Sequence, residues 1–114
     1  MSLAIERATF FVADFEIQFD WYVEKAGAEV AWRFQSALDD SLRKLSNRPD
    51  LGRIRHFRNP KLGGLRSYRV ERPFKKLLIF YRVEADCLQA VRLMHGARDL
   101  PRRLSQPPGA PAEP

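Results

Sequence analysis

The 114-residue sequence predicts a single α+β domain with the element order β-α-α-β-β-β. Two observations predict this class. Two apolar stripes at helical spacing occupy residues 14–48, and three runs of strand-forming residues follow between residues 65 and 95. A chain of this length buries roughly two-thirds of the surface that its unfolded form exposes, which suffices for a core without disulfides. We therefore expect one helical hairpin packed on one face of a mostly antiparallel sheet.

The first strand and the first helix are predicted from the N-terminal residues. Residues 5–11 are rich in β-forming side chains and are expected to form a short strand. Asp14 follows, and its carboxylate is suited to accept hydrogen bonds from the free N–H groups of a helix start. Apolar side chains then recur at intervals of three and four up to Ala26, which is the spacing of one helix face. Gly27 is suited to the left-handed position that ends a helix.

A second, longer helix is predicted directly after the first. Apolar side chains recur every three or four positions from Ala31 to Leu45. Pro49 disfavours helical geometry in the residue before it and therefore closes this helix. Two helices joined by so short a link must pack as an antiparallel hairpin.

The second half of the sequence changes to the period of strands. Residues 49–52 have the composition of a turn, and residues 53–64 are expected to form a basic loop. Strands are predicted at 65–71, 77–83 and 87–95, and their short connections favour an antiparallel meander. The middle run is almost continuously apolar, as expected for a central strand that is covered on both faces.

The C-terminal residues are predicted to form a disordered tail. Residues 105–114 contain four prolines and no large apolar side chain. They cannot bury enough surface to offset the entropy lost on ordering. We therefore expect the folded domain to span residues 1–104.

The composition excludes several classes of site. The single cysteine, Cys87, excludes an internal disulfide and a Cys-rich metal centre, and we expect neither a metal nor a cofactor. No apolar run approaches the roughly 20 residues that a transmembrane helix needs. The N-terminus lacks the pattern of a signal peptide. We therefore expect a cytoplasmic protein without a membrane partner.

Positive charge is concentrated in the second half of the chain, and the formal net charge of the whole is +6. Residues 1–52 hold six Lys and Arg against nine Asp and Glu, whereas residues 53–103 hold fourteen against four. Such an asymmetry within one domain costs self-repulsion and favours a polyanionic partner for the second half. The alternative interpretation is a solvated basic surface without a specific partner.

Four segments carry a resemblance to a known family. They are A-D-F-E-I at residues 13–17, L-S-N-R-P-D-L-G at 45–52, L-G-G-L-R-S-Y-R-V with L-L-I-F-Y-R-V at 62–70 and 77–83, and R-L-M-H-G-A-R-D-L at 92–100. In this order they resemble the RelE/ParE superfamily of toxins from type II toxin–antitoxin systems, and the ParE branch most. The resemblance implies a small cytoplasmic toxin that a cognate, ParD-like ribbon-helix-helix antitoxin neutralises in a hetero-oligomer.

The resemblance implies two alternative activities, and a third alternative is a degenerate member that still binds an antitoxin but no longer harms the cell. ParE-like members are implied to inhibit DNA gyrase without catalysing a reaction, whereas RelE-like members are implied to cut mRNA on the ribosome. The cut requires a base, an acid and cations around the phosphate. The candidate residues for that alternative are His95, His56, Arg66 and Arg82. His95 also has a purely structural interpretation as the end of the last strand, and the ending H-G-A-R-D-L favours the gyrase inhibitor.

Two surfaces are candidates for binding. The expected target surface consists of basic residues in the loop and near the C-terminus: Arg53, Arg55, Arg58, Lys61, Arg98, Arg102 and Arg103. Phosphate contacts there would make binding sensitive to salt. Trp21, Tyr22 and Trp32 fall beside the predicted core stripes, so we expect them to line a groove for an antitoxin helix or arm. The alternative is that these three side chains only cover the edges between helices and sheet.

Overall fold

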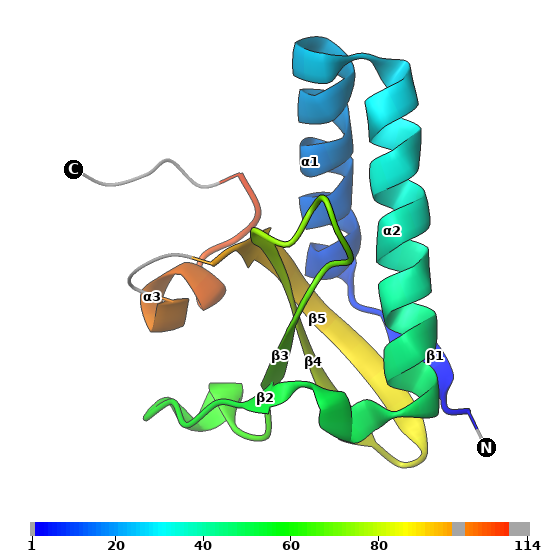
Figure 1. Cartoon of the computed structure of the whole chain (residues 1–114). Coiled ribbons are helices and arrows are strands. Elements are labelled where there is room, and N and C mark those ends of the chain that lie inside the picture. The colour runs from blue at the N-terminus through cyan, green and yellow to red at the C-terminus, as the bar shows by residue number, and fades with distance from the viewer. Residues whose placement is uncertain (1, 97–99, 110–114) are drawn as a thin grey trace.

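Two layers make up the protein, a five-stranded sheet and a pair of long helices that cover one of its faces (Figure 1). The computed structural model describes residues 2–96 and 100–109. Its elements are β1 (Ala4–Arg7), α1 (Thr9–Ala26), α2 (Ala28–Asn47), η1 (Pro49–Leu51), β2 (Arg53–Ile54), η2 (Pro60–Leu62), β3 (Arg66–Arg69), β4 (Leu77–Glu84), β5 (Cys87–His95) and α3 (Leu100–Leu104). The predicted α+β class with a helical hairpin on one face of the sheet is confirmed.

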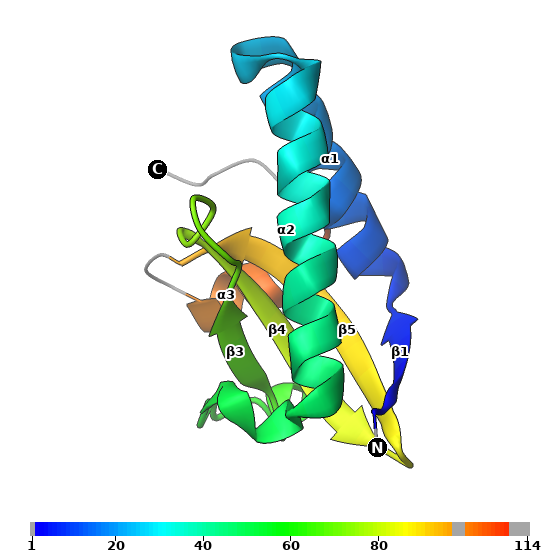
Figure 2. The same ribbon diagram turned by 45° about the vertical axis from the view of Figure 1, so that its right-hand side comes forward.

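The strands follow the spatial order β1-β5-β4-β3-β2. β2, β3, β4 and β5 pair antiparallel, as predicted for a meander. β1 pairs parallel with the first half of β5, in a register that joins Ala4 to Cys87 and Arg7 to Ala90. The sheet is therefore mixed, and Figure 2 shows β1 and β3 on opposite sides of it. Because the helical hairpin separates β1 from the meander, β1 is free to join the edge beside the last strand.

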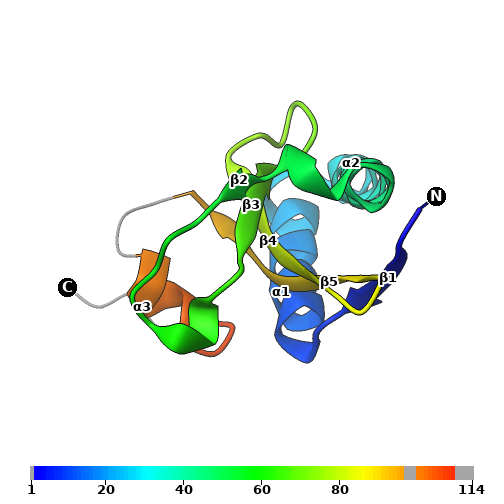
Figure 3. The ribbon, with the colours of Figure 1, turned by 90° about the horizontal axis from the view of Figure 1, so that it is seen from below.

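Hydrophobic side chains fill both faces of β4. Leu77, Ile79 and Tyr81 point toward the helices, and the alternate residues Leu78 and Phe80 point to the other side. On that other side they pack against Leu62 of η2 and Leu104 of α3, and Figure 3 shows α3 on the side of β4 away from α2. The prediction of a central strand covered on both faces is thus confirmed.

The first strand is shorter than predicted, and the first helix begins earlier. β1 ends at Arg7, so Phe10 and Phe11 belong to α1 instead of the predicted strand at residues 5–11. The local sequence favours a strand, but burial of Phe11 in the helix-side core favours the helix. Asp14 consequently lies in the second turn of α1 and does not cap it, which corrects the predicted helix start.

The ends of the helical hairpin agree with the sequence. Gly27 joins the two helices with a φ of 97°, a value that favours glycine. α2 ends at Asn47, directly before Arg48 and Pro49. The predicted loop at 53–64 is partly wrong, because Arg53–Ile54 pair with β3 and Pro60–Leu62 form a 3-10 turn.

The chain after β5 folds back toward α1. Among the residues predicted to be a tail, the carbonyl of Gln106 accepts a hydrogen bond from Arg92 at 2.5 Å, and Gly109 lies beside Ile17. Residues 110–114 lie outside the described part of the chain, and the domain limit at residue 104 stays a prediction. None of the helices that the structure describes combines the length and apolar character of a membrane span.

Candidate functional site

A basic trough runs along β2, β3 and the connection between β3 and β4. It is a cavity of about 470 Å³, and five cationic side chains line it: Arg53, Arg55, Arg69, Arg72 and Lys75. The pairing of Arg53 with Ser67 brings the two short strands together at this place. The structure thus unites two residues of the predicted target surface with three cations that the sequence analysis passed over.

Arg55 is the cation that the fold holds most firmly. Its Nε donates a hydrogen bond to the Ser67 hydroxyl at 2.8 Å, and its guanidinium lies 6.0 Å from the centre of the Phe80 ring. Burial, followed by the charges of Arg53 and Arg69, lowers the pKa of Arg55. Repulsion from the two neighbouring arginines thus adds to the effect of burial on Arg55.

The trough has little negative charge to offset these cations. Glu71 is the one carboxylate that lines it, and the ammonium of Lys44 binds its Oε1 at 2.5 Å. Within residues 2–96 and 100–109, none of the five cations forms an ion pair with a carboxylate. The trough therefore carries an excess of positive charge, which a bound anionic ligand would offset.

A second basic cavity, of about 350 Å³, lies between η2, β5 and α3. Lys61, Arg82 and Arg92 line it. Arg82 donates from Nη2 to the Lys61 carbonyl at 3.0 Å, while its Nε is buried without a hydrogen-bond acceptor in the described part of the chain. Lys61 of the predicted target surface is therefore held apart from Arg53 and Arg55.

The remaining predicted target residues do not join either cavity as a group. Arg58 is exposed in the loop before η2, and Arg102 is exposed in α3. Arg103 donates from Nη1 to the carbonyl of His95 at 3.2 Å. Arg98 lies outside the residues that the structure describes.

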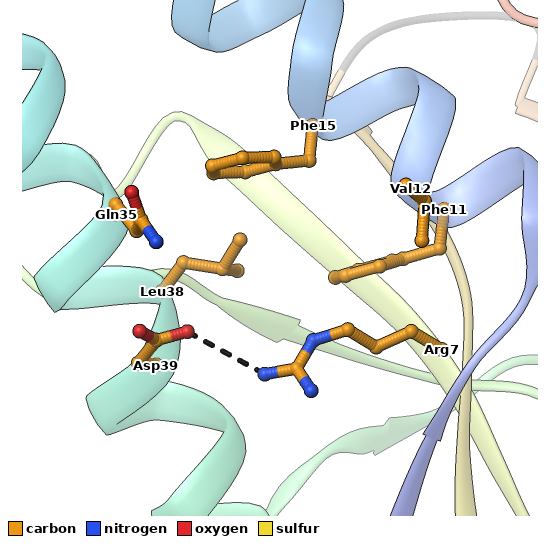
Figure 4. A pocket seen from close by; sticks show the side chains of 7 residues that line it. All are labelled: Arg7, Phe11, Val12, Phe15, Gln35, Leu38 and Asp39. Carbon is orange, nitrogen blue, oxygen red and sulfur yellow. Dashed lines mark hydrogen bonds and ion pairs between the residues drawn. The ribbon is translucent and has the colours of Figure 1, made fainter.

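An apolar groove opens between the two long helices, away from the basic trough. Its cavity of about 300 Å³ is lined by Phe11, Val12 and Phe15 from α1 and by Gln35 and Leu38 from α2 (Figure 4). The ion pair between Arg7 and Asp39, at 3.4 Å, lies at one end of it. We call this surface the interhelical groove.

The three predicted antitoxin residues differ in exposure. Trp32 and Trp21 are 59% and 51% exposed, whereas Tyr22 is half-buried and packs on Phe34 and Phe74. Trp32 contacts Phe19 edge-on, with ring centroids 5.3 Å apart. Trp32 does not line the interhelical groove but a separate cavity between α2 and the connection from β3 to β4, where Arg72 and Phe74 also lie. Tyr22 instead packs against the helix-side core from its margin, an arrangement that the edge-covering alternative describes.

A family model described as the ParE toxin of the type II toxin–antitoxin system parDE matches residues 6–100. The chain belongs to the ParE toxin family. The predicted place in the RelE/ParE superfamily, on the ParE branch, is confirmed. No curated protein matches the chain significantly in sequence.

Two solved structures resemble this ParE-family chain in fold. A chain of the chromosomal ParDE system from P. aeruginosa has a TM-score of 0.66 and 21% identity, over 82% of this chain and 96% of that one. A chain of the toxin–antitoxin complex RelBE2 from Mycobacterium tuberculosis has a TM-score of 0.56 and 15% identity, over 84% of this chain and 100% of that one. At such identities the likeness concerns the fold.

The candidate catalytic residues of this ParE-family chain do not form an acid–base arrangement. His56 is exposed in a loop, and His95 is exposed at the end of β5. Within the described residues neither imidazole makes a hydrogen bond. Arg66 donates to the carbonyls of Gly52 and Asp50, at 2.8 and 3.3 Å, and Arg82 binds a carbonyl as described above. Both guanidiniums thus serve the local fold.

The environment of His95 disfavours its protonated form. Partial burial, followed by the charges of Arg103 and Lys76, lowers the pKa of its imidazole below the usual value of 6.5. A histidine that is neutral at pH 7 has no proton to give to a leaving group. This direction is the opposite of what a general acid for RNA cleavage requires.

The shift of His95 predicts a dependence of stability on pH. Below about pH 6.5 the unfolded chain binds a proton at this position more readily than the folded chain, so acidification through that range should lower stability. Above that range both forms are neutral, and no effect is expected. NMR titration should give His95 a pKa below 6.5. Lys76→Gln should raise that pKa slightly, and an unchanged value would contradict the contribution of the Lys76 charge but not that of burial.

Proposed function

We propose that this ParE-family chain is the toxin of a type II toxin–antitoxin module, neutralised by a cognate antitoxin and, when free, inhibiting DNA gyrase. The observation that carries the proposal is a basic surface on which residues 2–96 and 100–109 provide no organised pair of proton donor and acceptor. Such a surface supplies charge for binding a nucleoprotein target but no chemistry for cutting RNA. A cytoplasmic location follows from a cytoplasmic target.

Gyrase assays test the target directly. Purified toxin is expected to inhibit supercoiling and to accumulate cleaved gyrase–DNA complexes, and to leave mRNA on translating ribosomes intact. His95→Ala should leave the inhibition unchanged, because the imidazole has no role in binding charge. Cutting of mRNA that disappears in His95→Ala would establish the ribosome-dependent nuclease instead.

Charge on the target surface should control the strength of gyrase inhibition. Replacing both Arg53 and Arg58 by glutamine removes two exposed cations and should weaken inhibition about tenfold, or ~1.4 kcal/mol, with a shallower dependence on salt. The matched control replaces Arg33 and Arg43 on the outer face of α2, which removes the same charge elsewhere. Equal losses in both variants would show that only net charge matters, and would contradict a defined target surface.

We place the antitoxin on the interhelical groove. The two related structures come from a ParDE system and a RelBE2 complex, which supports a protein partner, here expected to be ParD-like and to form a hetero-oligomer with the toxin. An amphipathic helix or extended arm would cover Val12 and Phe15 in the groove. Where it continues past Phe19, it would also cover the exposed ring of Trp32, which contacts Phe19 and lines the neighbouring cavity on α2. Trp21 is exposed as well and would lie at the margin of the contact.

Trp32 should be the dominant aromatic contact for the antitoxin. Trp32→Ala should weaken toxin–antitoxin binding tenfold or more, since buried tryptophans at interfaces often contribute about 2 kcal/mol or more. Ile54→Ala removes a similarly exposed apolar side chain on β2 and serves as the control. Calorimetric titration with a cognate ParD-like antitoxin measures the affinity of both variants. Unchanged affinity in Trp32→Ala would move the antitoxin away from the groove.

A further inference from the structure

The second basic cavity, between η2, β5 and α3, has a positively charged lining without a carboxylate. Its volume of about 350 Å³ falls at the lower end of the range that is typical of small-molecule sites, about 300–1,000 Å³. Of its three basic side chains, Arg92 already binds the carboxylate of Asp14 and two backbone carbonyls. Lys61 and Arg82 remain, and no Asp or Glu is among the described residues that line the cavity. The cavity therefore favours an anionic ligand.

Arg82 has donors that the fold does not use. Its Nη2 binds the carbonyl of Lys61, but its Nε is buried and has no acceptor in the described part of the chain. Its Nη1 lies 3.9 Å from the carboxylate of Glu84, which is too far for a hydrogen bond. Because a buried donor without an acceptor lowers stability, a ligand that brings oxygen atoms to this guanidinium gains binding energy there.

The turn η2 places two further donor groups at the same cavity. The side-chain oxygen of Asn59 accepts the N–H of Lys61 at 3.0 Å, which leaves the amide nitrogen of Asn59 as a donor. The ammonium of Lys61 forms no ion pair with a carboxylate among residues 2–96 and 100–109. A guanidinium, an ammonium and an amide together suit a phosphate group, whose oxygens accept several charge-assisted hydrogen bonds.

An exposed aromatic ring also lines this cavity. Phe10 is 45% exposed, and the guanidinium of Arg92 lies 5.4 Å from the centre of its ring. Since Arg92 is itself held by Asp14, the ring rests on a fixed support. The other apolar lining residues are Leu62, Val91 and Leu104. A nucleobase of any identity can stack on such a ring, because every base has an aromatic face.

We propose that the second basic cavity binds a nucleoside monophosphate, with the phosphate on Lys61 and Arg82 and the base on Phe10. The inference goes beyond the proposed function, which assigns no small ligand to the chain. A free mononucleotide and the 5′-phosphorylated end of a strand present the same chemical groups, so the experiment has to separate these two sources.

Isothermal titration calorimetry of the whole chain with thymidine 5′-monophosphate tests the proposal. Binding should be saturable and sensitive to salt. Thymidine and inorganic phosphate should each bind at least about tenfold more weakly, because each offers only part of the contacts. A 5′-phosphorylated oligothymidylate separates the sources. Binding at least about tenfold tighter than that of the mononucleotide identifies a strand end as the ligand, and equal or weaker binding identifies the free nucleotide.

Substitutions locate the ligand in the cavity. Lys61→Gln and Arg82→Gln should each weaken binding of the monophosphate at least about tenfold. Phe10→Ala should weaken binding of the monophosphate but not of inorganic phosphate. Arg43→Gln removes the same charge from an exposed ion pair on α2 and should preserve binding. Circular dichroism checks that each variant is folded, and Arg82→Lys replaces Arg82→Gln if the latter is not.

Four results would overturn the proposal. They are the absence of saturable binding, equal affinity for thymidine or inorganic phosphate, equal losses in Lys61→Gln and Arg43→Gln, and equal binding of oligothymidylates with and without the 5′-phosphate. Because these measurements involve neither gyrase nor an antitoxin, a failure of this inference is distinguishable from a failure of the proposed function.

Discussion

Replacing Arg92 by methionine is expected to lower the free energy of unfolding by about 3–5 kcal/mol. The Arg92 side chain is 6% exposed, and its Nε and Nη2 donate to the carboxylate of Asp14 at 2.7 and 3.1 Å. Its Nη1 donates to the carbonyls of Leu104 and Gln106 at 3.1 and 2.5 Å. The substitution leaves the 8% exposed Asp14 side chain as a buried charge without its partner, and detaches the chain after α3 from the sheet.

Asp14 also binds the backbone of β5, so substitutions at this site should lower stability more than the loss of one ion pair would. One carboxylate oxygen accepts the N–H of Leu93 at 3.0 Å, on the edge of β5 beyond its pairing with β1. The carboxylate thus ties α1 to the last strand. Replacing Asp14 by leucine together with Arg92→Met removes both charges and should recover part of the lost stability, because no buried charge then remains.

Urea denaturation measures the free energy of unfolding of both variants, and Arg7→Met serves as the control. The ion pair between Arg7 and Asp39 has side chains that are 43% and 46% exposed, and exposed pairs contribute less than about 1 kcal/mol. Similar losses in Arg92→Met and Arg7→Met would show that burial does not strengthen the Asp14 contact. A double variant less stable than Arg92→Met would show that the carboxylate is stabilised by something other than Arg92.

Replacing Gly52 by alanine should cost about 3 kcal/mol of stability through overpacking and lost hydrogen bonds. An added Cβ would lie 2.3 Å from the Tyr81 hydroxyl and 2.6–2.7 Å from two ring carbons. The backbone of Gly52 has a φ of −70°, which any residue adopts, so space alone requires glycine here. Tyr81 is completely buried and has no room to move away.

The Tyr81 hydroxyl joins the strands to the end of the helical hairpin. It accepts the N–H of Gly52 at 2.8 Å and donates to the carbonyl of Pro49 at 2.7 Å. Tyr81→Phe removes both bonds without a clash and should cost about 1–3 kcal/mol, less than Gly52→Ala. Equal stability of Gly52→Ala and the unchanged protein would contradict the close approach.

Gly52→Ala should also weaken the partner-binding surface. The carbonyl of Gly52 accepts a hydrogen bond from Arg66, and Arg53 follows directly in β2. A shift of Gly52 therefore moves the start of the basic trough. Gyrase inhibition should weaken in Gly52→Ala, while antitoxin binding at the interhelical groove should be retained.

The sequence by itself determined the class, the family and most element limits. Apolar spacing places α2, the change of period places β4 and β5, and Gly27 and Pro49 mark the helix ends. These features are local, because a helix or strand is encoded by side chains a few residues apart. The sequence also shows the excess of positive charge after residue 52, because the charge of a segment is the sum over its residues and does not depend on the fold.

Only the tertiary structure decided which residues act together. Asp14 looked like a helix cap because its partner, Arg92, is 78 residues away. The pairing of β2 with β3 brings Arg53 and Arg55 into the same cavity as Arg69, Arg72 and Lys75. Lys61 lines a different cavity. Tyr22 is half-buried against the core, whereas Trp32 is largely exposed. The physical reason is that pairing and burial depend on contacts between distant segments, which local periodicity does not encode.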